Sequence, residues 1–438
     1  MTQPKEVSIV GLGTVGQALA CAMLAAGYRV TGIDLNVDRQ NDLLRFACAS
    51  SASQRLVVGL RPLPSRNHII AVATPLRVKD KVGDLRSLVS ASRAIGTVLR
   101  PGDLVVVRST VPVGTVRNIV SGELSDSSRL ASDEFHLAYA PERCVVGDEA
   151  REIATLPQLV GAIDSEAALR AHDLFASVTG PVISMQAVEA AELAKLANNA
   201  YNDLRHAFSN QIAMIAERYN LDAVRLIDEA NRDYPRDPMV RPSPGVGGSC
   251  LTKDPYLLAQ SLDEPSLPNL FTVGRNVNDR IVADIITLAV EFSNIHTTDT
   301  RVLVCGAAFK GHPPTQDTRG SVGVLVANQL RDYGMSVAVH DPCVTEQQIF
   351  DLGLSPHPEL FDGSRFDIVL LIGSHSYYED KLVGSEVRQL LKSPSLVYDP
   401  WSFIDPNVLR RDSPNVTYAS IGFRSTPATA AVSHAPPE

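Results

Sequence analysis

The first third of the chain alternates short apolar runs with amphipathic helical patterns. Apolar runs occupy residues 6–10, 28–33, 68–73 and 104–108, and a helical pattern that reaches residue 26 separates the first two. Apolar runs of this length bounded by turn residues are typical of buried strands, and strands that alternate with helices predict a parallel sheet. We therefore expect a doubly wound α/β domain in this part of the chain.

The same alternation restarts near residue 301, after a long helical pattern over residues 187–218. Strand patterns follow at 301–306, 336–341, 366–372 and 396–399, with a helical run over 322–333. The predicted fold class is α/β, with two doubly wound Rossmann-like domains joined by a helical domain with a long connecting helix. The predicted domains are 1–185, 186–295 and 296–422, and a tail at 423–438, rich in Ala, Pro and Thr, is expected to be disordered.

Composition and charge narrow the class of protein. The 438 residues exceed one ordinary core, and 45% hydrophobic with 20% charged residues predict a soluble globular protein. A net charge of −9 disfavours sequence-independent binding of nucleic acid, which needs surplus Lys and Arg. We see no signal peptide and no run of ~18 apolar residues, so no membrane span is expected.

The six cysteines are scattered along the chain. They stand at positions 21, 48, 144, 250, 305 and 343, without C-x-x-C pairs or nearby histidine partners. This pattern suits a reducing cytoplasm and predicts no metal site.

A dinucleotide-binding pattern follows the first apolar run. Gly11, Gly13 and Gly16 form G-x-G-x-x-G between a strand and a helix, and Asp34 ends the second strand. The glycines permit the turn and the approach of a pyrophosphate, while the acid accepts from ribose hydroxyls and repels a 2′-phosphate. NAD is favoured over NADP, although Arg39 stands five residues after Asp34. The turn residues predicted to bind the cofactor are Gly11, Gly13, Thr14, Val15 and Gly16.

Small polar, proline and acidic residues follow three further strands of this domain. They are Thr74 with Pro75, Thr110, and Glu142. Ligands of open α/β sheets bind at the carboxyl ends of strands, so Thr74, Pro75 and Thr110 are candidates to line the cofactor site. The alternative for the threonines is turn chemistry, and for Glu142 it is a solvated loop charge.

The long helical pattern carries a polar face beside its apolar stripe. Lys195 and Asn199 stand four residues apart and therefore lie one above the other. A solvated amphipathic face is the alternative, but amides and a lone lysine replace the usual Glu/Lys pairs. We expect Asp203 and His206, on the same face, to be structural. Arg236 follows in a segment whose arginines are candidates to bind phosphates.

A glycine-rich stretch, residues 245–254, carries one cysteine. Gly247 and Gly248 precede Cys250, and Lys253 and Asp254 follow it. Glycine tolerates positive φ and leaves room for a ligand, and a cationic neighbour favours the thiolate, the reactive form of cysteine. The alternative is a buried structural cysteine in a tight turn.

Taken together, these motifs resemble the nucleotide-sugar 6-dehydrogenase family, which includes UDP-glucose and UDP-N-acetylmannosamine dehydrogenases. The resemblance extends to about residue 420. The matching segments, in the family's order, are 11–16, 109–114, 141–143, the helix with Lys195 and Asn199, 247–254, and 308–310.

The resemblance implies a four-electron oxidation of a sugar hydroxymethyl group to a carboxylate with two NAD+. Cys250 would add to the intermediate aldehyde, and a second oxidation would give a thioester that water hydrolyses. Lys195 and Asn199 match the family's oxyanion-stabilising pair, and Asp254 matches a carboxylate that acts with Lys195 in proton transfer. Glu142 and Thr110 match residues near the hydrolytic water.

The resemblance also implies binding residues. On the cofactor side it adds Lys253, which is also a candidate to stabilise the thiolate, and Arg319. On the substrate side the predicted residues are Glu142, Arg143, Lys195, Asn199, Arg236, Gly247, Gly248, Phe309 and Lys310, with the third domain holding the UDP group.

The identity of the sugar is less constrained. Residues 141–147, 230–236 and 242–248 resemble the UDP-N-acetylhexosamine branch (N-acetylmannosamine or N-acetylglucosamine), whereas Ser249 and residues 251–253 look more like the UDP-glucose branch. The motifs are also compatible with a two-electron 3-hydroxyacid-type dehydrogenase, which needs no cysteine, and with a non-catalytic nucleotide-sugar binding protein. The resemblance further suggests polysaccharide biosynthesis and a homodimer or larger homo-oligomer.

Overall fold

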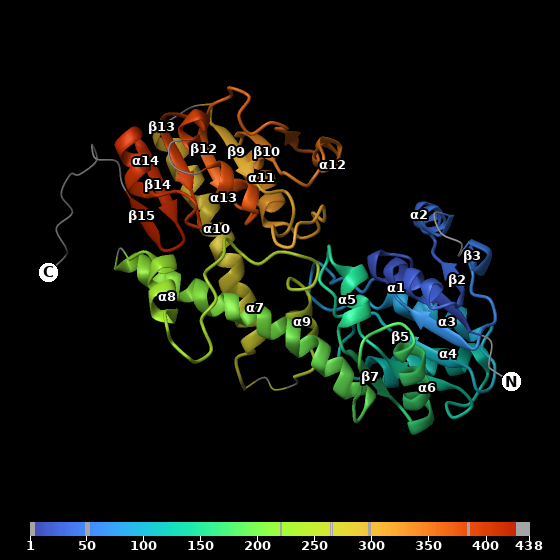
Figure 1. Ribbon diagram of the computed structural model, residues 1–438. Helices are drawn as coiled ribbons and strands as arrows, with labels where there is room; N and C mark the ends of the chain where they lie inside the picture. The colour runs from blue at the N-terminus through green and yellow to red at the C-terminus, as the bar shows by residue number, and fades with distance from the viewer. Residues whose placement is uncertain are drawn as a thin grey trace. The chain divides into compact units, whose positions relative to one another are not determined.

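The computed structural model describes residues 5–48, 53–219, 221–262, 264, 266–296, 299–382 and 386–425. The chain forms two compact units, one of residues 1–200 with 253–267 and the other of residues 201–252 with 268–438. The helix α7 (Val188–Arg218) begins in the first unit and ends in the second, and it is drawn in green in Figure 1.

The first unit is built on an eight-stranded sheet in the order β3-β2-β1-β4-β5-β6-β7-β8. All neighbours pair in parallel except β6 and β7, which are antiparallel. The strands are β1 Glu6–Val10, β2 Arg29–Ile33, β3 Leu56–Gly59, β4 Asn67–Ile70, β5 Leu104–Val107, β6 His136–Tyr139, β7 Gln158–Ala162 and β8 Val182–Ser184. The order of the first six strands is the doubly wound order that the alternating pattern predicts.

Helices cover both faces of this sheet (Figure 1). One face packs mainly on α1 and α6, and the other on α3, η2, α4 and the start of α7. The helices of the unit are α1 Thr14–Ala25, α2 Val37–Cys48, η1 Ser53–Arg55, α3 Arg86–Gly96, η2 Val116–Val120, α4 Ser121–Ser128, α5 Glu149–Thr155, α6 Ser165–Ala176 and α9 Asp254–Ala259. The central strands are buried on both sides, which explains their nearly continuous apolar runs.

The second unit repeats this plan on a seven-stranded sheet in the order β11-β10-β9-β12-β13-β14-β15. Its strands are β9 Arg301–Cys305, β10 Ser336–His340, β11 Ser355–Pro356, β12 Phe366–Leu371, β13 Leu391–Tyr398, β14 Val416–Ser420 and β15 Phe423–Ser425. Its helices are α8 Ala223–Asn231, α10 Leu270–His296, α11 Val322–Asp332, α12 Glu346–Asp351, α13 Ser376–Lys381, η3 Glu386–Leu390 and α14 Pro406–Asp412. The predicted class of two doubly wound domains with a long connecting helix is therefore confirmed.

The end of the chain differs from the prediction. We expected a disordered tail from residue 423, but Phe423–Ser425 form β15, which pairs antiparallel with β14 and thereby extends the second sheet. The rest of the predicted tail, residues 426–438, lies outside the described residues. The predicted three-domain division stays a prediction, because the central segment is shared between the two units.

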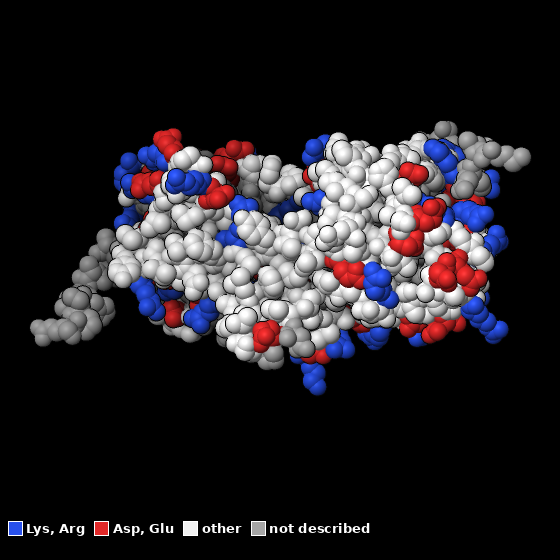
Figure 2. Space-filling model, turned by 90° about the horizontal axis from the view of Figure 1, so that it is seen from below, with Lys and Arg blue, Asp and Glu red and all other residues white. Residues whose placement is uncertain are grey.

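Lys and Arg side chains are interspersed with Asp and Glu on the face that Figure 2 shows. No helix in the described part of the chain is both long and apolar enough to cross a membrane.

Candidate active site

The turn between β1 and α1 has the geometry that the glycine pattern predicts. Gly11 has a φ of +99°, and a Cβ added there would lie 2.5 Å from the carbonyl oxygen of Ala71. A Cβ at Gly16 would lie 1.8 Å from the carbonyl oxygen of Gly11, so only glycine allows this approach of helix and turn. Within the described residues no side chain caps α1, and the uncapped amide groups at the N-terminus of a helix favour the binding of a pyrophosphate.

Asp34 follows β2, where the dinucleotide motif requires a carboxylate. Its Oδ2 accepts a hydrogen bond from the amide of Leu12 at 2.7 Å, and its Oδ1 accepts one from the amide of Asn36 at 2.8 Å. Nη1 of Arg39 lies 3.5 Å from the same Oδ2. The carboxylate is thus fixed beside the glycine turn, and the residues of this turn fit NAD.

The loops after β4 and β5 are tied together. The buried hydroxyl of Thr74 donates to the carbonyl oxygen of Thr110 at 2.6 Å, and the hydroxyl of Ser109 donates to that of Val72 at 2.7 Å. The carbonyl oxygen of Pro75 accepts from the amide of Asp84 at 2.7 Å. Thr74 therefore has at least the turn-stabilising role that its position after a strand allows.

Several donors hold Glu142, which follows β6. Its Oε1 accepts from the amides of Arg143 and Cys144, both at 2.7 Å, and its Oε2 pairs with Arg108. Burial opposes ionisation, but the Arg108 guanidinium and the hydrogen bonds from Cys144 outweigh it and lower the pKa of Glu142 to about 2. The guanidinium of Arg143 donates to the carbonyl oxygen of Pro157 at 3.3 Å. Glu142 is thus an ionised acceptor and not a solvated loop charge.

Three of the predicted polar residues meet where α7 faces the start of α9. Asn199 Nδ2 donates to Oδ2 of Asp254 at 2.6 Å, and Lys253 Nζ lies 2.7 Å from Oδ1 of the same carboxylate. Asp254 is 1% exposed and Lys195 is 8% exposed. Within the described residues no salt bridge joins Lys195 to Asp254, whose bound partners are Asn199 and Lys253.

Glu192 lies one turn before Lys195 on the polar face of α7, and the sequence patterns gave it no role in the site. Its side chain is fully buried, and it accepts from the amides of Gly114 at 2.6 Å and Val116 at 2.9 Å. Burial raises the pKa of Glu192 to about 7, although these two hydrogen bonds lower it. Glu192 therefore joins α7 to the loop that follows Thr110. A buried acid on a polar helix face was the only signal that could have identified it.

Cys250 and its glycine loop belong to the second unit. Gly248 has a φ of +90°, its amide donates to the carbonyl oxygen of Gly320 at 3.0 Å, and a Cβ there would lie 2.8 Å from the Phe309 ring. A Cβ at Gly247 would lie 2.7 Å from the carbonyl oxygen of Gly320. Cys250 itself is exposed, which excludes a buried structural cysteine. The predicted substrate residues Gly247, Gly248 and Phe309 thus come together.

A network of buried polar side chains hydrogen-bonds to the loop that carries Cys250. Arg275 on α10 donates to Oδ1 of Asp203 at 2.6 Å and to the carbonyl oxygen of Val246 at 3.3 Å. Asn278 donates to the same Asp203 oxygen at 2.9 Å. Asp203 is completely buried, in agreement with the structural role that we expected for it. Its carboxylate orients Arg275, which in turn hydrogen-bonds to the loop that carries Cys250.

The remaining predicted cations have identified neighbours. Arg319 is paired with Asp317 through two nitrogens, with its Nε 2.9 Å and its Nη2 2.5 Å from the carboxylate. Nζ of Lys310 lies 5.5 Å from the ring centroid of Phe309. The guanidinium of Arg236 lies 5.9 Å from the ring centroid of Tyr234, and the residue is exposed.

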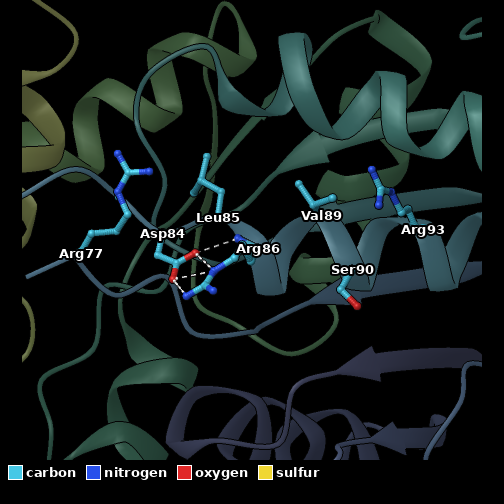
Figure 3. A pocket seen from close by; sticks show the side chains of 8 residues that line it. Arg77, Asp84, Leu85, Arg86, Val89, Ser90 and Arg93 are labelled. Atoms are coloured by element: carbon cyan, nitrogen blue, oxygen red, sulfur yellow. Dashed lines mark hydrogen bonds and ion pairs between the residues drawn. The ribbon is translucent and has the colours of Figure 1, made fainter.

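A shallow groove in the first unit, of about 540 Å³, contains none of the predicted site residues (Figure 3). Its arginines are all paired with carboxylates, and the pairs are Arg77–Asp80, Arg86–Asp84 and Arg93–Glu123. Within the described residues no group of three or more His, Cys, Asp or Glu is placed to hold a metal ion.

Known proteins resemble the chain along most of its length. A UDP-N-acetyl-D-glucosamine 6-dehydrogenase of Pseudomonas aeruginosa is 31% identical over 90% of this chain and 96% of its own length. An NDP-N-acetyl-D-galactosaminuronic acid dehydrogenase of Ralstonia nicotianae is 34% identical over 85% of this chain and 92% of its own. The solved structure of a UDP-D-ManNAc dehydrogenase from Pyrococcus horikoshii superposes with a TM-score of 0.78 at 25% identity, covering 95% of this chain and 99% of that one.

Three models of one family match successive parts of the sequence. In the UDP-glucose/GDP-mannose dehydrogenase family, the NAD binding domain matches residues 58–179, the central domain 189–280 and the UDP binding domain 303–406. The chain therefore belongs to the UDP-glucose/GDP-mannose dehydrogenase family and is an NAD-dependent nucleotide-sugar dehydrogenase.

Proposed function

We propose that this enzyme oxidises the C6 hydroxymethyl group of a UDP-N-acetylhexosamine to the carboxylate. The relatives named above support this substrate class, since their names carry N-acetylglucosamine, N-acetylgalactosaminuronic acid and N-acetylmannosamine. The match of residues 303–406 to a UDP binding domain supports the nucleotide. The segments 141–147 and 242–248 resemble the same branch of the family.

The overall reaction consumes one alcohol, two NAD+ and one water, and gives the carboxylate, two NADH and three protons. When bound, NAD accepts one hydride in each of the two oxidations. After the first oxidation Sγ of Cys250 adds to the aldehyde carbon, because a planar aldehyde has no hydride to give until a nucleophile has added. The second oxidation leaves a thioester on Cys250, and water cleaves its C–S bond.

The first unit supplies the polar groups for these steps. Lys195 and Asn199 stabilise the developing oxyanion, and Asp254 acts with Lys195 in proton transfer. The bonds from Asn199 and Lys253 to Asp254 hold this carboxylate in one orientation. Thr110 and Glu142 orient the hydrolytic water. Further proposed cofactor contacts are Thr74, Pro75, Lys253 and Arg319, and further proposed substrate contacts are Arg143, Arg236, Gly247, Gly248, Phe309 and Lys310.

One observation carries the proposal: the only cysteine in the family's glycine loop is exposed, and the loop packs on Phe309 through glycines that admit no side chain. Cys144 and Cys305 offer no alternative nucleophile, because burial raises the pKa of each thiol well above its ordinary value. A covalent thioester therefore has Cys250 as its natural attachment point.

NADH release identifies the substrate and the electron count together. We expect two NADH per sugar with UDP-GlcNAc, UDP-ManNAc or UDP-GalNAc, and slower turnover with UDP-glucose and GDP-mannose. Cys250→Ala should form no uronate, whereas the control Cys21→Ala, at a free cysteine on α1 that the proposed mechanism does not use, should keep its activity. One NADH per sugar would instead support a two-electron 3-hydroxyacid-type dehydrogenase, and binding without turnover would support a nucleotide-sugar binding protein.

The second candidate substrate is UDP-glucose. Ser249 and the segment 251–253, which follow the UDP-glucose branch, favour it. A higher kcat/KM with UDP-glucose than with every acetamido sugar would replace the first assignment by this one.

We also propose that the enzyme forms a homodimer or a larger homo-oligomer in the cytoplasm, where its product would serve polysaccharide biosynthesis. The second unit's part of α7 exposes Tyr201, Phe208 and Ile215 by 64%, 56% and 50%. Their seven-residue spacing places them on one helix face, and such an apolar stripe is typical of a helix–helix interface. Light scattering should find a dimer or larger species, and Phe208→Asp should shift it toward the monomer.

A further inference from the structure

The buried guanidinium of Arg108, which comes directly after β5, pairs with the proposed hydrolytic carboxylate. Its residue is 2% exposed, and its guanidinium carbon lies 5.5 Å from the ring centroid of Phe175. A charged group is removed from water at a cost of several kcal/mol unless it is paired and hydrogen-bonded. The hydrogen-bond partners of Arg108 therefore indicate why a charged side chain is buried at this position.

The partners of Arg108 all lie either on residues 140–142 or on strand β7, which begins with Gln158. Nη1 donates to the carbonyl oxygen of Ala140 at 3.2 Å and to Oε1 of Gln158 at 2.9 Å, while Nη2 pairs with Oε2 of Glu142. Gln158 in turn donates through Nε2 to the carbonyl oxygen of Pro141 at 3.0 Å. Arg108 and Gln158 thus hold the backbone and the side chain of residues 140–142 at several points.

These contacts hold the carboxylate of Glu142 in one orientation. A carboxylate has about four acceptor positions. The amides of Arg143 and Cys144 occupy both positions of Oε1, and Arg108 occupies one position of Oε2. The thiol of Cys144, a weak donor, also hydrogen-bonds to this carboxylate, and its place is the one that a water molecule would take.

We propose that Arg108, fixed by Gln158, is a positioning residue for the hydrolysis of the thioester: it holds the carboxylate of Glu142 in the orientation in which it accepts a hydrogen bond from the attacking water. This inference rests on the proposed function. In the step, the water oxygen attacks the carbonyl carbon, the C–S bond breaks and the Cys250 thiolate leaves. One proton passes to Asp254, which acts with Lys195 in the proposed mechanism, and the other passes to solvent, since Glu142 only accepts a hydrogen bond.

Electrostatics support the geometry. The charged and titratable groups that face Glu142 are Arg108 at the end of β5 and Cys144 in its own loop, and together they hold the pKa of Glu142 at about 2 against the effect of burial. An acceptor that stays ionised throughout the working pH range gives hydrolysis no acid limb. Without the guanidinium, one of the groups that oppose the effect of burial is lost, so the pKa of Glu142 would rise.

Two substitutions at Arg108 separate charge from position. Arg108→Gln keeps one donor but removes the charge, so the pH profile of kcat should gain an acid limb. Arg108→Lys keeps the charge but cannot reach all three partners, so kcat should fall with no new limb. Because hydrolysis is the step affected, both variants should still release two NADH per site in a rapid first phase, followed by a steady state about 10- to 100-fold slower than that of wild type.

Gln158→Met provides a third test if a variant at Arg108 does not fold, because it loosens the guanidinium without changing any charge. Its steady state should slow with the rapid phase intact. Arg93→Gln is the matched control, since Arg93 forms an exposed pair with Glu123, 2.6 Å between Nε and Oε2, in the same unit. It should match wild type in both phases.

The inference is overturned if these variants keep the wild-type kcat, or if the rapid phase slows as much as the steady state, which would indicate a general structural role. Failure of the proposed function gives a different result. In that case wild type itself would release one NADH per sugar, or Cys250→Ala would still form uronate.

Discussion

Replacing Glu192 by glutamine should remove a pH dependence of stability from the first unit. Glu192 is completely buried on α7, where it accepts from the amides of Gly114 and Val116. Burial raises its pKa from the ordinary 4.5 to about 7; the two amides and Arg117 oppose this effect, and Glu189 adds to it. A neutral glutamine of the same length cannot titrate.

The sign and the size of this pH dependence follow from the difference in the pKa of Glu192 between the folded and the unfolded state. Between pH 4.5 and 7 the native state keeps a proton on Glu192 that the unfolded chain has lost. This contribution to stability is therefore complete below pH 4.5 and is lost as the pH rises through 7. At about 1.4 kcal/mol per pKa unit it amounts to about 3 kcal/mol. For a domain of 150–250 residues, this is a change of about 6–12 °C in Tm.

Thermal melts between pH 4.5 and 8, followed by circular dichroism, test this value. The Tm of wild type relative to that of Glu192→Gln should fall by about 6–12 °C between pH 4.5 and pH 8. Glu189→Gln is the control, because Glu189 pairs with Arg117 near the surface and its pKa is lowered, so its difference should stay flat. A constant difference for Glu192→Gln would refute the assignment of a buried, protonated acid.

Three further outcomes can be checked directly. Iodoacetamide should label exposed Cys250 before Cys305, whose thiol pKa burial raises, and mass spectrometry of the peptides would show the reverse order if the assignment is wrong. Gly248→Ala should lower kcat/KM by about 10-fold or more, because its Cβ would lie 2.8 Å from the Phe309 ring at a φ of +90°; unchanged kinetics would contradict the tight packing. Asp34→Asn should raise the KM for NAD by about 10-fold and narrow the preference over NADP, since a charge-assisted hydrogen bond and a repulsion are both lost. If the preference for NAD over NADP did not change, residues other than Asp34 would determine it.

Local patterns predicted most of the fold. Apolar runs bounded by turn residues located the central strands, and the helical pattern over 187–218 agrees with α7 to within one residue at its start. These features depend on neighbours in sequence, which is why they could be predicted. The strand β15 could not, because its stability comes from pairing with β14 and from no pattern of its own.

The candidate site shows the same division. The glycines, Asp34 and Cys250 could be identified because a turn or a nucleophile needs a particular residue type. The partners that orient the site could not, since Arg108 and Glu142 are 34 residues apart, and Glu192 and Gly114 are 78 apart. Only the folded sheet and helices bring such pairs together.

A second glycine turn was also hidden from the sequence. A Cβ at Gly323 on α11 would lie 1.8 Å from the carbonyl oxygen of Gly306, as Gly16 would from Gly11, but a long loop separates the second pair and obscures the motif. In a saturation mutagenesis screen for growth or activity, Gly16 and Gly323 should therefore tolerate substitution as poorly as Cys250. Loss of function at Gly16 or Gly323 would arise because a side chain there collides with the backbone and disturbs folding. Purifying the variant and testing whether it folds would distinguish this effect from the loss of a catalytic group.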